Sequence, residues 1–398
     1  MYPLAERTKQ IAPFHAVELL KTAQQLQNAG HDIISLGIGE PDFTAPSAVV
    51  QALQAASNQG LSQYTSPLGL PALRKAISQY YQQQFGAQLH PDRILVTTGA
   101  SAALNLACLA VINPGDEILM PDPSYPANQN FVFAAGGVPK LIPCNAQQRY
   151  QLSARDVARH WGPTTKGLLI ASPSNPTGTS LPHDELKAII EEVRRRQGFI
   201  IMDEIYLGLY YEQSPRSALT LDDDILIINS FSKYFQMTGW RLGWMIMPEA
   251  HRPAIERMAA SLAICAPSLA QHAALACFEP STLALYEERR LTLKARRDYL
   301  LPALEDLGFS IPVKPDGAFY IYADIRAFDK DSQRFAHRLL HEAHVVAVPG
   351  LDFGPVHAAH MLRFSYATPL PRLEQAIERM RVFLKTYSAA EAQLAQQA

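Results

Sequence analysis

SFSKYFQMTGWRLGW occupies residues 230–244. It places one lysine, Lys233, and one arginine, Arg241, among hydroxyl groups, aromatic rings and glycines. A lysine that loses solvation beside a second cation has a lowered pKa, so its neutral amine can act as a nucleophile or base. Arg241 and the hydroxyls of Ser230 and Ser232 could hold a phosphate. The stretch predicts a lysine that forms a Schiff base with a phosphate-bearing aldehyde, although its first four residues alone are more typical of a solvated loop.

Apolar strands alternate with helical patterns through the middle of the chain. The expected strands are Ile94–Thr97, Leu168–Ala171, Phe199–Met202 and Ile225–Ile228, and the expected helices include Ala102–Val111 and Asp184–Arg196. Such alternation is typical of a largely parallel sheet covered by helices. Near Tyr286–Leu307 the pattern changes to a long charged helix, followed by short strands such as Ala318–Ala323 and helices such as Ser332–Ala343. We therefore predict an α/β fold, with a large domain over 46–288 and a smaller α+β domain from 1–45 and 289–398.

Polar residues follow the last three of these strands. Asn175 follows the first of the three, Asp203 and Tyr206 follow the second, and Ser230 and Lys233 follow the third. In open parallel sheets, ligands bind outside the carboxyl ends of the strands. The sequence therefore predicts that an amide, a carboxylate, a phenol and a lysine line one crevice.

A glycine turn follows the strand Ile94–Thr97. Gly99, Ala100 and Ser101 lead directly into a helix, so free backbone N–H groups and a hydroxyl meet the positive end of the helix dipole. The same residues also suit an ordinary helix cap. With Arg241 available, a phosphate-binding turn is the preferred interpretation. The chain has neither a G-x-G-x-x-G motif nor a P-loop lysine motif, which argues against dinucleotides and nucleoside triphosphates.

Composition limits the class of protein. The chain has 398 residues, 48% hydrophobic and 18% charged, which is typical of a soluble globular protein. A net charge of −2 gives no reason to expect binding to nucleic acid or to an anionic membrane. The four cysteines have no metal-ligand spacing, so no metal site is predicted. The N-terminus lacks a signal-peptide pattern and no apolar run is long enough to span a membrane, so a cytoplasmic protein is expected.

Nine motifs point to one known family. They are SLGIGEPDF (35–43), YTSPLGLPALRKAI (64–77), TTGAS (97–101), DPSYPAN (122–128), SPSNPTGT (172–179), MDEIY (202–206), SFSKYFQMTGWRLGW (230–244), DGAFYIY (316–322) and RFSYA (363–367). With these motifs in order, the chain resembles the class I/II, fold-type I pyridoxal-phosphate aminotransferases over almost its whole length.

The resemblance implies roles around the cofactor ring. Lys233 would carry the internal aldimine and then move a proton between the substrate Cα and the cofactor C4′. Asp203 would lie beside the pyridine nitrogen and favour the protonated ring, which is the better electron sink. Asn175 and Tyr206 would bind the phenolic oxygen of the ring. Tyr125 would stack on the ring, its alternative being an aromatic residue of the core.

The resemblance also implies the ligands of the phosphate group and the substrate. The cofactor phosphate would be held by Ala100, Ser101, Ser230, Arg241 and, from the neighbouring subunit, Tyr64. A homodimer with a shared active site is therefore expected. Arg363 would clamp the substrate α-carboxylate at two points. Gly39 and Asn175 would contribute to the same substrate site.

The implied activity is transfer of an amino group from an L-amino acid to a 2-oxo acid, 2-oxoglutarate or pyruvate, through a pyridoxamine phosphate intermediate. The alternative is a β-lyase of the cysteine-conjugate or cystathionine type, because the same cofactor pocket serves both reactions. A transcription regulator on this fold would need an additional DNA-binding domain, and the family motifs begin by residue 35.

The side-chain preference is left open by the motifs. Members that prefer dicarboxylic substrates have an added cation, which in one subgroup is a lysine at the position of Ser101. Here that cation could instead come from Lys9, from Lys21 or from a partner subunit. Four aromatic residues could line an apolar pocket or belong to the core of the smaller domain: Phe14, Phe319, Tyr320 and Tyr366.

Overall fold

The structure is a computed structural model that describes residues 2–11, 15–356 and 358–397. Its central sheet has seven strands in the order β2-β8-β7-β6-β5-β3-β4. Their bounds are β2 (Ile94–Thr97), β3 (Glu117–Asp122), β4 (Val138–Pro143), β5 (Thr165–Ala171), β6 (Phe199–Asp203), β7 (Leu226–Ser230) and β8 (Gly243–Ile246). Strands β3 to β7 pair in parallel, whereas β8 is antiparallel to both of its neighbours, β7 and β2. The predicted α/β class with a mostly parallel sheet is confirmed.

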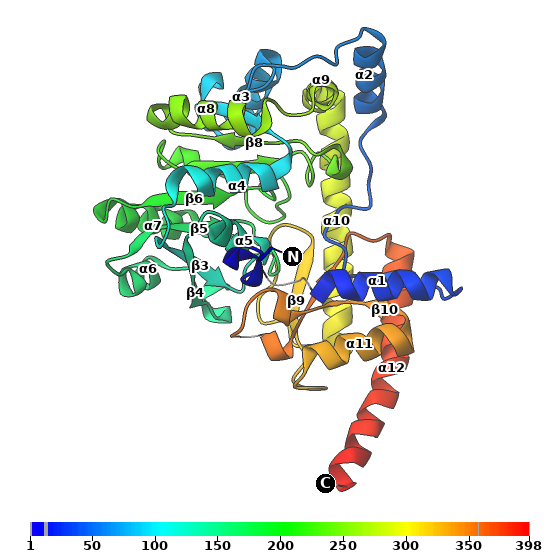
Figure 1. Cartoon of the computed structure of the whole chain (residues 1–398). Helices are drawn as coiled ribbons and strands as arrows, with labels where there is room; N and C mark the ends of the chain where they lie inside the picture. The colour runs from blue at the N-terminus through cyan, green and yellow to red at the C-terminus, as the bar shows by residue number, and fades with distance from the viewer. Residues whose placement is uncertain (1, 12–14, 357, 398) are drawn as a thin grey trace.

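The central strands of the sheet are buried on both faces because most of their residues are apolar. Ile200 and Met202 of β6 belong to one hydrophobic cluster, whereas Ile201 between them belongs to another. Successive side chains of a strand point to opposite faces, so the two clusters are the two sides of the sheet. The helices around the sheet are α2 (Ser47–Asn58), α3 (Pro71–Phe85), α4 (Gly99–Val111), α5 (Ala127–Ala134), α6 (Ala154–His160), α7 (His183–Arg195), α8 (Arg252–Ala263) and α9 (Ser268–Ala274) (Figure 1).

A smaller sheet lies beside this unit and is built from the last part of the chain. Its strands are β9 (Tyr320–Asp324), β11 (Val348–Pro349) and β12 (Met361–Ser365), paired antiparallel in the order β11-β12-β9. The early strand β1 (Ile34–Ser35) pairs in parallel with β10 (Val345–Val346), which joins an N-terminal segment to this C-terminal part of the chain. The helices here are α1 (His15–Asn28), α11 (Ser332–Ala343) and α12 (Leu370–Gln397).

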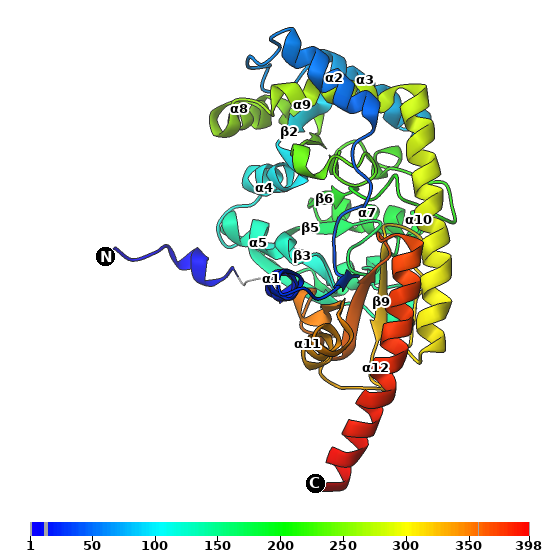
Figure 2. The same cartoon turned by 90° about the vertical axis from the view of Figure 1, so that its right-hand side faces the viewer.

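One long helix, α10 (Pro280–Asp306), runs along the side of the molecule (Figure 2). It begins six residues before the expected start at Tyr286, and Pro280 occupies its first turn, where the missing N–H costs nothing. The proposed division between 288 and 289 falls inside this unbroken helix and stays a prediction. Helix α11 has the bounds that the sequence predicts, and α4 begins at Gly99, three residues earlier than expected.

Candidate active site

A cavity of about 300 Å³ lies at the carboxyl ends of β5, β6 and β7. It is lined by Gly39, Ala100, Ser101, Leu104, Tyr125, Ala171, Asn175, Asp203, Ile205, Tyr206, Ser230, Ser232, Lys233, Arg241, Tyr320 and Arg363. Every site residue predicted from the sequence is therefore in this cavity except Tyr64. The parallel strands bring these residues together because each strand ends at the same edge of the sheet.

Lys233 sits in the cavity with its amine directed at the first loop of the chain. Its Nζ donates a hydrogen bond to the Gly39 carbonyl at 2.5 Å and lies 5.9 Å from the centre of the Tyr206 ring. Burial lowers the pKa of Lys233 from 10.5 to about 8, the charge of Glu40 acts in the opposite direction, and Arg363 lowers the pKa further. A considerable fraction of this amine is therefore neutral near pH 7 and able to react with a carbonyl.

Asp203 is the last residue of β6 and is 3% exposed. Its Oδ1 accepts a hydrogen bond from the Ile205 N–H at 3.1 Å. Burial raises the pKa of Asp203 to about 7, while this hydrogen bond and the charge of Lys233 act in the opposite direction. A protonated ring nitrogen placed against this carboxylate would supply a close counter-charge and favour its ionised form.

Tyr206 and Tyr320 form a buried hydrogen-bonded pair. Their hydroxyl oxygens lie 2.8 Å apart, which joins the loop after β6 to β9 of the smaller sheet. Burial raises the pKa of Tyr206 well above its ordinary value, so the phenol stays protonated and can donate a hydrogen bond.

Arg363 on β12 is held by two hydrogen bonds, and its third guanidinium nitrogen has no partner among the described residues. Its Nη1 donates to Asn175 Oδ1 at 2.8 Å and its Nη2 donates to the Gly37 carbonyl at 2.7 Å. Its Nε is buried without a hydrogen-bond partner in the described part of the chain. The guanidinium carbon lies 4.4 Å from the centre of the Tyr320 ring. A buried guanidinium with an unsatisfied N–H that lines a cavity is suited to binding a carboxylate.

The other end of the cavity is shaped for an anion. Gly99 begins α4 with φ +77°, and a side chain there would have its Cβ 2.6 Å from Nη2 of Arg241. Thr98, the residue before the helix, makes no side-chain cap, so the first N–H groups of α4 stay available. Arg241 donates from Nη1 to the Thr238 carbonyl at 2.9 Å, and Ser230 and Ser232 line the same cavity. An uncapped helix start beside an arginine is an anion-binding arrangement.

These residues fit pyridoxal phosphate, the cofactor that the sequence resemblance implies. The phosphate would lie against the start of α4 and Arg241, the ring nitrogen against Asp203, and the aldehyde carbon near Lys233. The orphaned Nε of Arg363 and the buried, uncompensated carboxylate of Asp203 are the observations that this ligand set explains.

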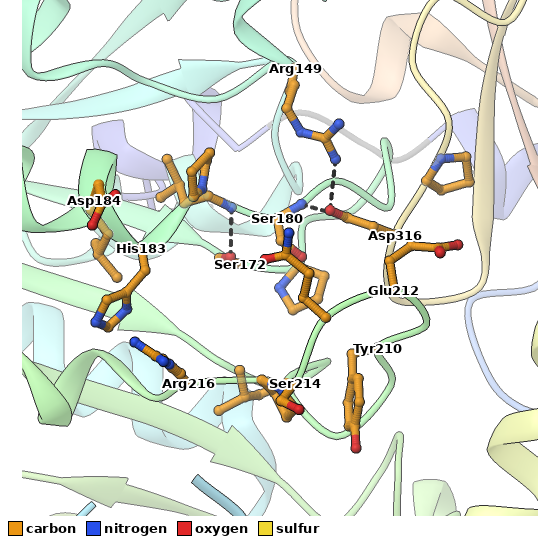
Figure 3. A pocket seen from close by; sticks show the side chains of 18 of the residues that line it. Arg149, Ser172, Ser180, His183, Asp184, Tyr210, Glu212, Ser214, Arg216 and Asp316 are labelled. Carbon is orange, nitrogen blue, oxygen red and sulfur yellow. Dashed lines mark hydrogen bonds and ion pairs between the residues drawn. The ribbon is translucent and has the colours of Figure 1, made fainter. Parts of the chain in front are cut away.

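A larger crevice, of about 890 Å³, lies elsewhere and is lined in part by Arg149, Ser180, Glu212 and Asp316 (Figure 3). Its charged walls are partly neutralised by the chain itself. Arg149 pairs with Asp316 at 2.7 Å, and the Ser180 N–H donates to the other oxygen of Asp316 at 2.8 Å (Figure 3). None of the predicted site residues line this crevice. The smaller cavity is therefore the candidate active site.

Several residues lie where sequence reasoning left them open or missed them. Tyr320 lines the cavity, whereas Tyr366 is buried in the core and donates to the Ala318 carbonyl at 3.3 Å. Phe319 is buried with its ring centre 6.0 Å from the Lys233 amine, and Phe14 is outside the described residues. Phe353, which no motif contains, packs its ring 5.1 Å from the Arg363 guanidinium.

Three residues lie on the surface that were considered either for contact with a neighbouring subunit or for binding the distal carboxylate of a dicarboxylic substrate. Tyr64 is 79% exposed, so its role at a shared site stays a prediction. Lys21 pairs with Glu18 at 2.7 Å on the surface of α1, and neither Lys21 nor Lys9 lines the cavity.

Comparison with known proteins gives a consistent result. The family model described as aminotransferase class I and II matches residues 31–380. The chain is 36% identical to the valine–pyruvate aminotransferase of Mycobacterium tuberculosis, over 94% of this chain and 97% of that protein. It is 33% identical to the aspartate aminotransferase of Geobacillus stearothermophilus, over 96% and 99%.

Solved structures agree with this result. A crystal structure of an aminotransferase from Mycobacterium tuberculosis matches with a TM-score of 0.93 at 36% identity and covers 97% of this chain and 100% of that chain. The aspartate aminotransferase from Thermus thermophilus with maleate matches with a TM-score of 0.90 at 33% identity, over 96% and 99%. Within the described residues, none of the helices combines the length and the apolar character needed to cross a membrane.

Proposed function

This chain belongs to the class I and II aminotransferases, and from that premise we propose that it moves the amino group of an L-amino acid to a 2-oxo acid with pyridoxal phosphate bound at Lys233. The observation that carries the proposal is the cavity itself. An amine with a lowered pKa, a buried carboxylate and an arginine with a free donor line the same small cavity. The three groups come from three segments: Lys233 from the loop after β7, Asp203 from the end of β6 and Arg363 from the middle of β12.

Pyridoxal phosphate, when bound, supplies an aldehyde that condenses with amines and a ring that withdraws electrons from the substrate Cα. Asp203 holds the ring nitrogen in its protonated form, because the buried carboxylate gains a counter-charge there. Tyr206, kept protonated by burial, donates to the ring oxygen beside the reacting carbon. Lys233 would be the base that takes the proton from the substrate Cα at Nζ, and the same Nζ would return it.

Arg363 orients the substrate. Its Nη1 and Nη2 are held by Asn175 and Gly37, so the guanidinium plane is fixed before substrate arrives. A carboxylate bound to such a fork has its Cα bonds in a defined direction, and the bond perpendicular to the ring is the one that breaks. This positioning favours loss of the Cα proton, which is the step that transamination requires.

We further infer that the preferred substrates have uncharged side chains and that pyruvate is a better acceptor than 2-oxoglutarate. The cations lining the cavity are Lys233, Arg241 and Arg363, and each is needed for another group. Within the described part of a single chain, the lining residues thus leave no cation for a distal carboxylate. The similarity to a valine–pyruvate aminotransferase supports the same choice.

We also propose a homodimer in which Tyr64 reaches the phosphate of the neighbouring subunit. The exposure of Tyr64 in the single chain supports this arrangement, because a phenol 79% exposed is free to contact a partner.

The test is a single-turnover experiment with the holoenzyme and one L-amino acid at a time, without a 2-oxo acid. We expect the absorbance of the lysine-bound cofactor to be replaced by that of the aminated cofactor, with one equivalent of 2-oxo acid released. The variant Lys233→Ala should bind the cofactor without this covalent absorbance and lose nearly all turnover. Release of ammonia and pyruvate with the original absorbance retained would instead identify a β-lyase.

A further inference from the structure

Asp122, the last residue of β3, has a buried carboxyl group that the reaction does not use. The residue is 1% exposed. Its Oδ2 accepts a hydrogen bond from the Val356 N–H at 3.2 Å, and its Oδ1 has no hydrogen-bond partner in the described part of the chain. A buried carboxylate oxygen without a partner is costly, whereas a neutral carboxyl group is much less so.

The carboxyl group is covered by the loop from Gly350 to Val356. Gly354 has φ +147°, and a Cβ at this position would collide with Asp122 Oδ1, so only glycine allows this approach. The neighbouring carbonyl of Phe353 accepts a hydrogen bond from the Ser124 N–H at 2.8 Å. The loop is therefore seated on the end of β3 by one backbone–backbone hydrogen bond, one hydrogen bond from the Val356 N–H to the Asp122 carboxyl group, and one close contact.

The same loop reaches the substrate arginine. Phe353 is 2% exposed, and its ring centre lies 5.1 Å from the Arg363 guanidinium carbon. On the other side, the carboxylate of Asp352 accepts hydrogen bonds from His15 N at 2.6 Å and Ala16 N at 2.7 Å, at the start of α1. A shift of this loop would therefore move the Phe353 ring relative to the guanidinium of Arg363, the residue proposed to bind the substrate α-carboxylate.

The groups that face Asp122 do not compensate a negative charge. They are the Cys144 thiol after β4 and the Tyr322 phenol on β9, both of which are kept neutral by raised pKa values. From the loop comes only the Val356 N–H. No cation among the described residues acts on Asp122, and burial raises its pKa to about 6.

We propose that Asp122 is a positioning residue of this active site: its neutral carboxyl group seats the loop Gly350–Val356, and the seated loop holds Phe353 against Arg363. The catalytic consequence rests on the proposed aminotransferase function. Because burial beneath the loop raises the pKa of this carboxyl from 3.8 to about 6, protonation favours the seated loop: seating weakens as pH rises toward about 6 and changes little above it, where the carboxyl is ionised in both states. Weaker seating loosens Arg363 and raises KM for the α-carboxylate substrate, with little effect on kcat.

The experiment measures KM and kcat of the holoenzyme for pyruvate between pH 5.5 and 7.5. Pyruvate has no group that titrates in this range. In the wild type, KM should rise by up to roughly fourfold, most of it below pH 6.5, which is the change expected for a carboxyl whose pKa is 3.8 with the loop released and about 6 with the loop seated. Asp122→Asn, which is neutral at every pH, should keep a low KM throughout. Asp324→Asn is the matched control, because Asp324 is a buried carboxylate that Arg326 already neutralises at 2.8 Å, and it should retain the pH dependence of the wild type.

Amide hydrogen exchange of residues 350–356 provides a readout that is independent of turnover. After correction for the intrinsic rate, exchange in the wild type and in Asp324→Asn should become faster between pH 5.5 and 6.5 and level off above that, and exchange in Asp122→Asn should not change with pH. If no donor and acceptor support turnover, the proposed function fails, and exchange alone still decides the seating of the loop. The proposal is overturned if Asp122→Asn keeps the wild-type pH dependence of KM, or if loop exchange changes with pH while KM does not.

Discussion

The lowered pKa of Lys233 makes a quantitative prediction about cofactor attachment. Only the neutral amine can attack the aldehyde of pyridoxal phosphate. With a pKa of about 8, about one amine in ten is neutral at pH 7, compared with roughly one in 3,000 for an ordinary lysine. The rate of covalent attachment to the cofactor-free protein should therefore rise with pH and reach half of its plateau near pH 8.

Glu40 provides the perturbation. Its charge is the strongest that opposes burial and raises the pKa of Lys233. Glu40→Gln should therefore lower this pKa further, shift the midpoint below pH 8 and speed attachment at pH 7 by up to about fivefold, the range for a charge near the surface. Glu191→Gln, on the exposed side of α7, is the control and should leave the midpoint unchanged.

The assay is stopped-flow absorbance after mixing cofactor-free protein with saturating pyridoxal phosphate between pH 6.5 and 9.5. A midpoint near pH 10 in the wild type would refute the argument that burial sets the pKa of Lys233. A shift of the Glu40→Gln midpoint to higher pH would refute the assigned sign of the Glu40 charge.

Three further changes test the remaining contacts. Arg363→Lys removes the planar guanidinium, so kcat/KM should fall by about 100-fold, equivalent to the loss of one or two charge-assisted hydrogen bonds. The resting cofactor absorbance should be unchanged, and loss of this absorbance would show that Arg363 has a structural role. Asp203→Asn should still attach the cofactor but lose at least about 100-fold in single-turnover rate, because a neutral amide cannot hold the ring nitrogen protonated; unchanged turnover would remove Asp203 from the chemistry. Tyr64→Phe should weaken cofactor affinity in a protein that sediments as a dimer, and wild-type affinity would show that Tyr64 does not reach the phosphate.

The residues that line the cavity were largely predictable. Asn175, Asp203 and Lys233 each follow an apolar strand, and parallel strands necessarily end at the same edge of a sheet. The start of α4 at Gly99 was visible as a glycine turn between a strand and a helix. These signals are local in the chain, so hydrophobic periodicity and turn residues were enough to place them.

Other features depend on contacts between distant segments. The hydrogen bond between Tyr206 and Tyr320 spans 114 positions, and that between Arg363 and Gly37 spans 326. No local pattern indicates which strands of the smaller sheet face the ends of the larger one. The predicted boundary inside α10 shows the same difficulty, since one continuous helix runs past both sheets.

The sequence by itself determined the class of fold and the residue types that line the cavity, among them the lysine proposed to react, because each is encoded in a short segment whose conformation depends on its own neighbours. Only the tertiary structure decided how these groups behave. Burial lowers the pKa of Lys233 and raises the pKa of Asp203. It also leaves the Nε of Arg363 without a hydrogen-bond partner in the described part of the chain. The fold also places the Phe353 ring against the Arg363 guanidinium. Desolvation is a property of the assembled environment, which is formed by segments hundreds of residues apart and is absent from any single stretch of the chain.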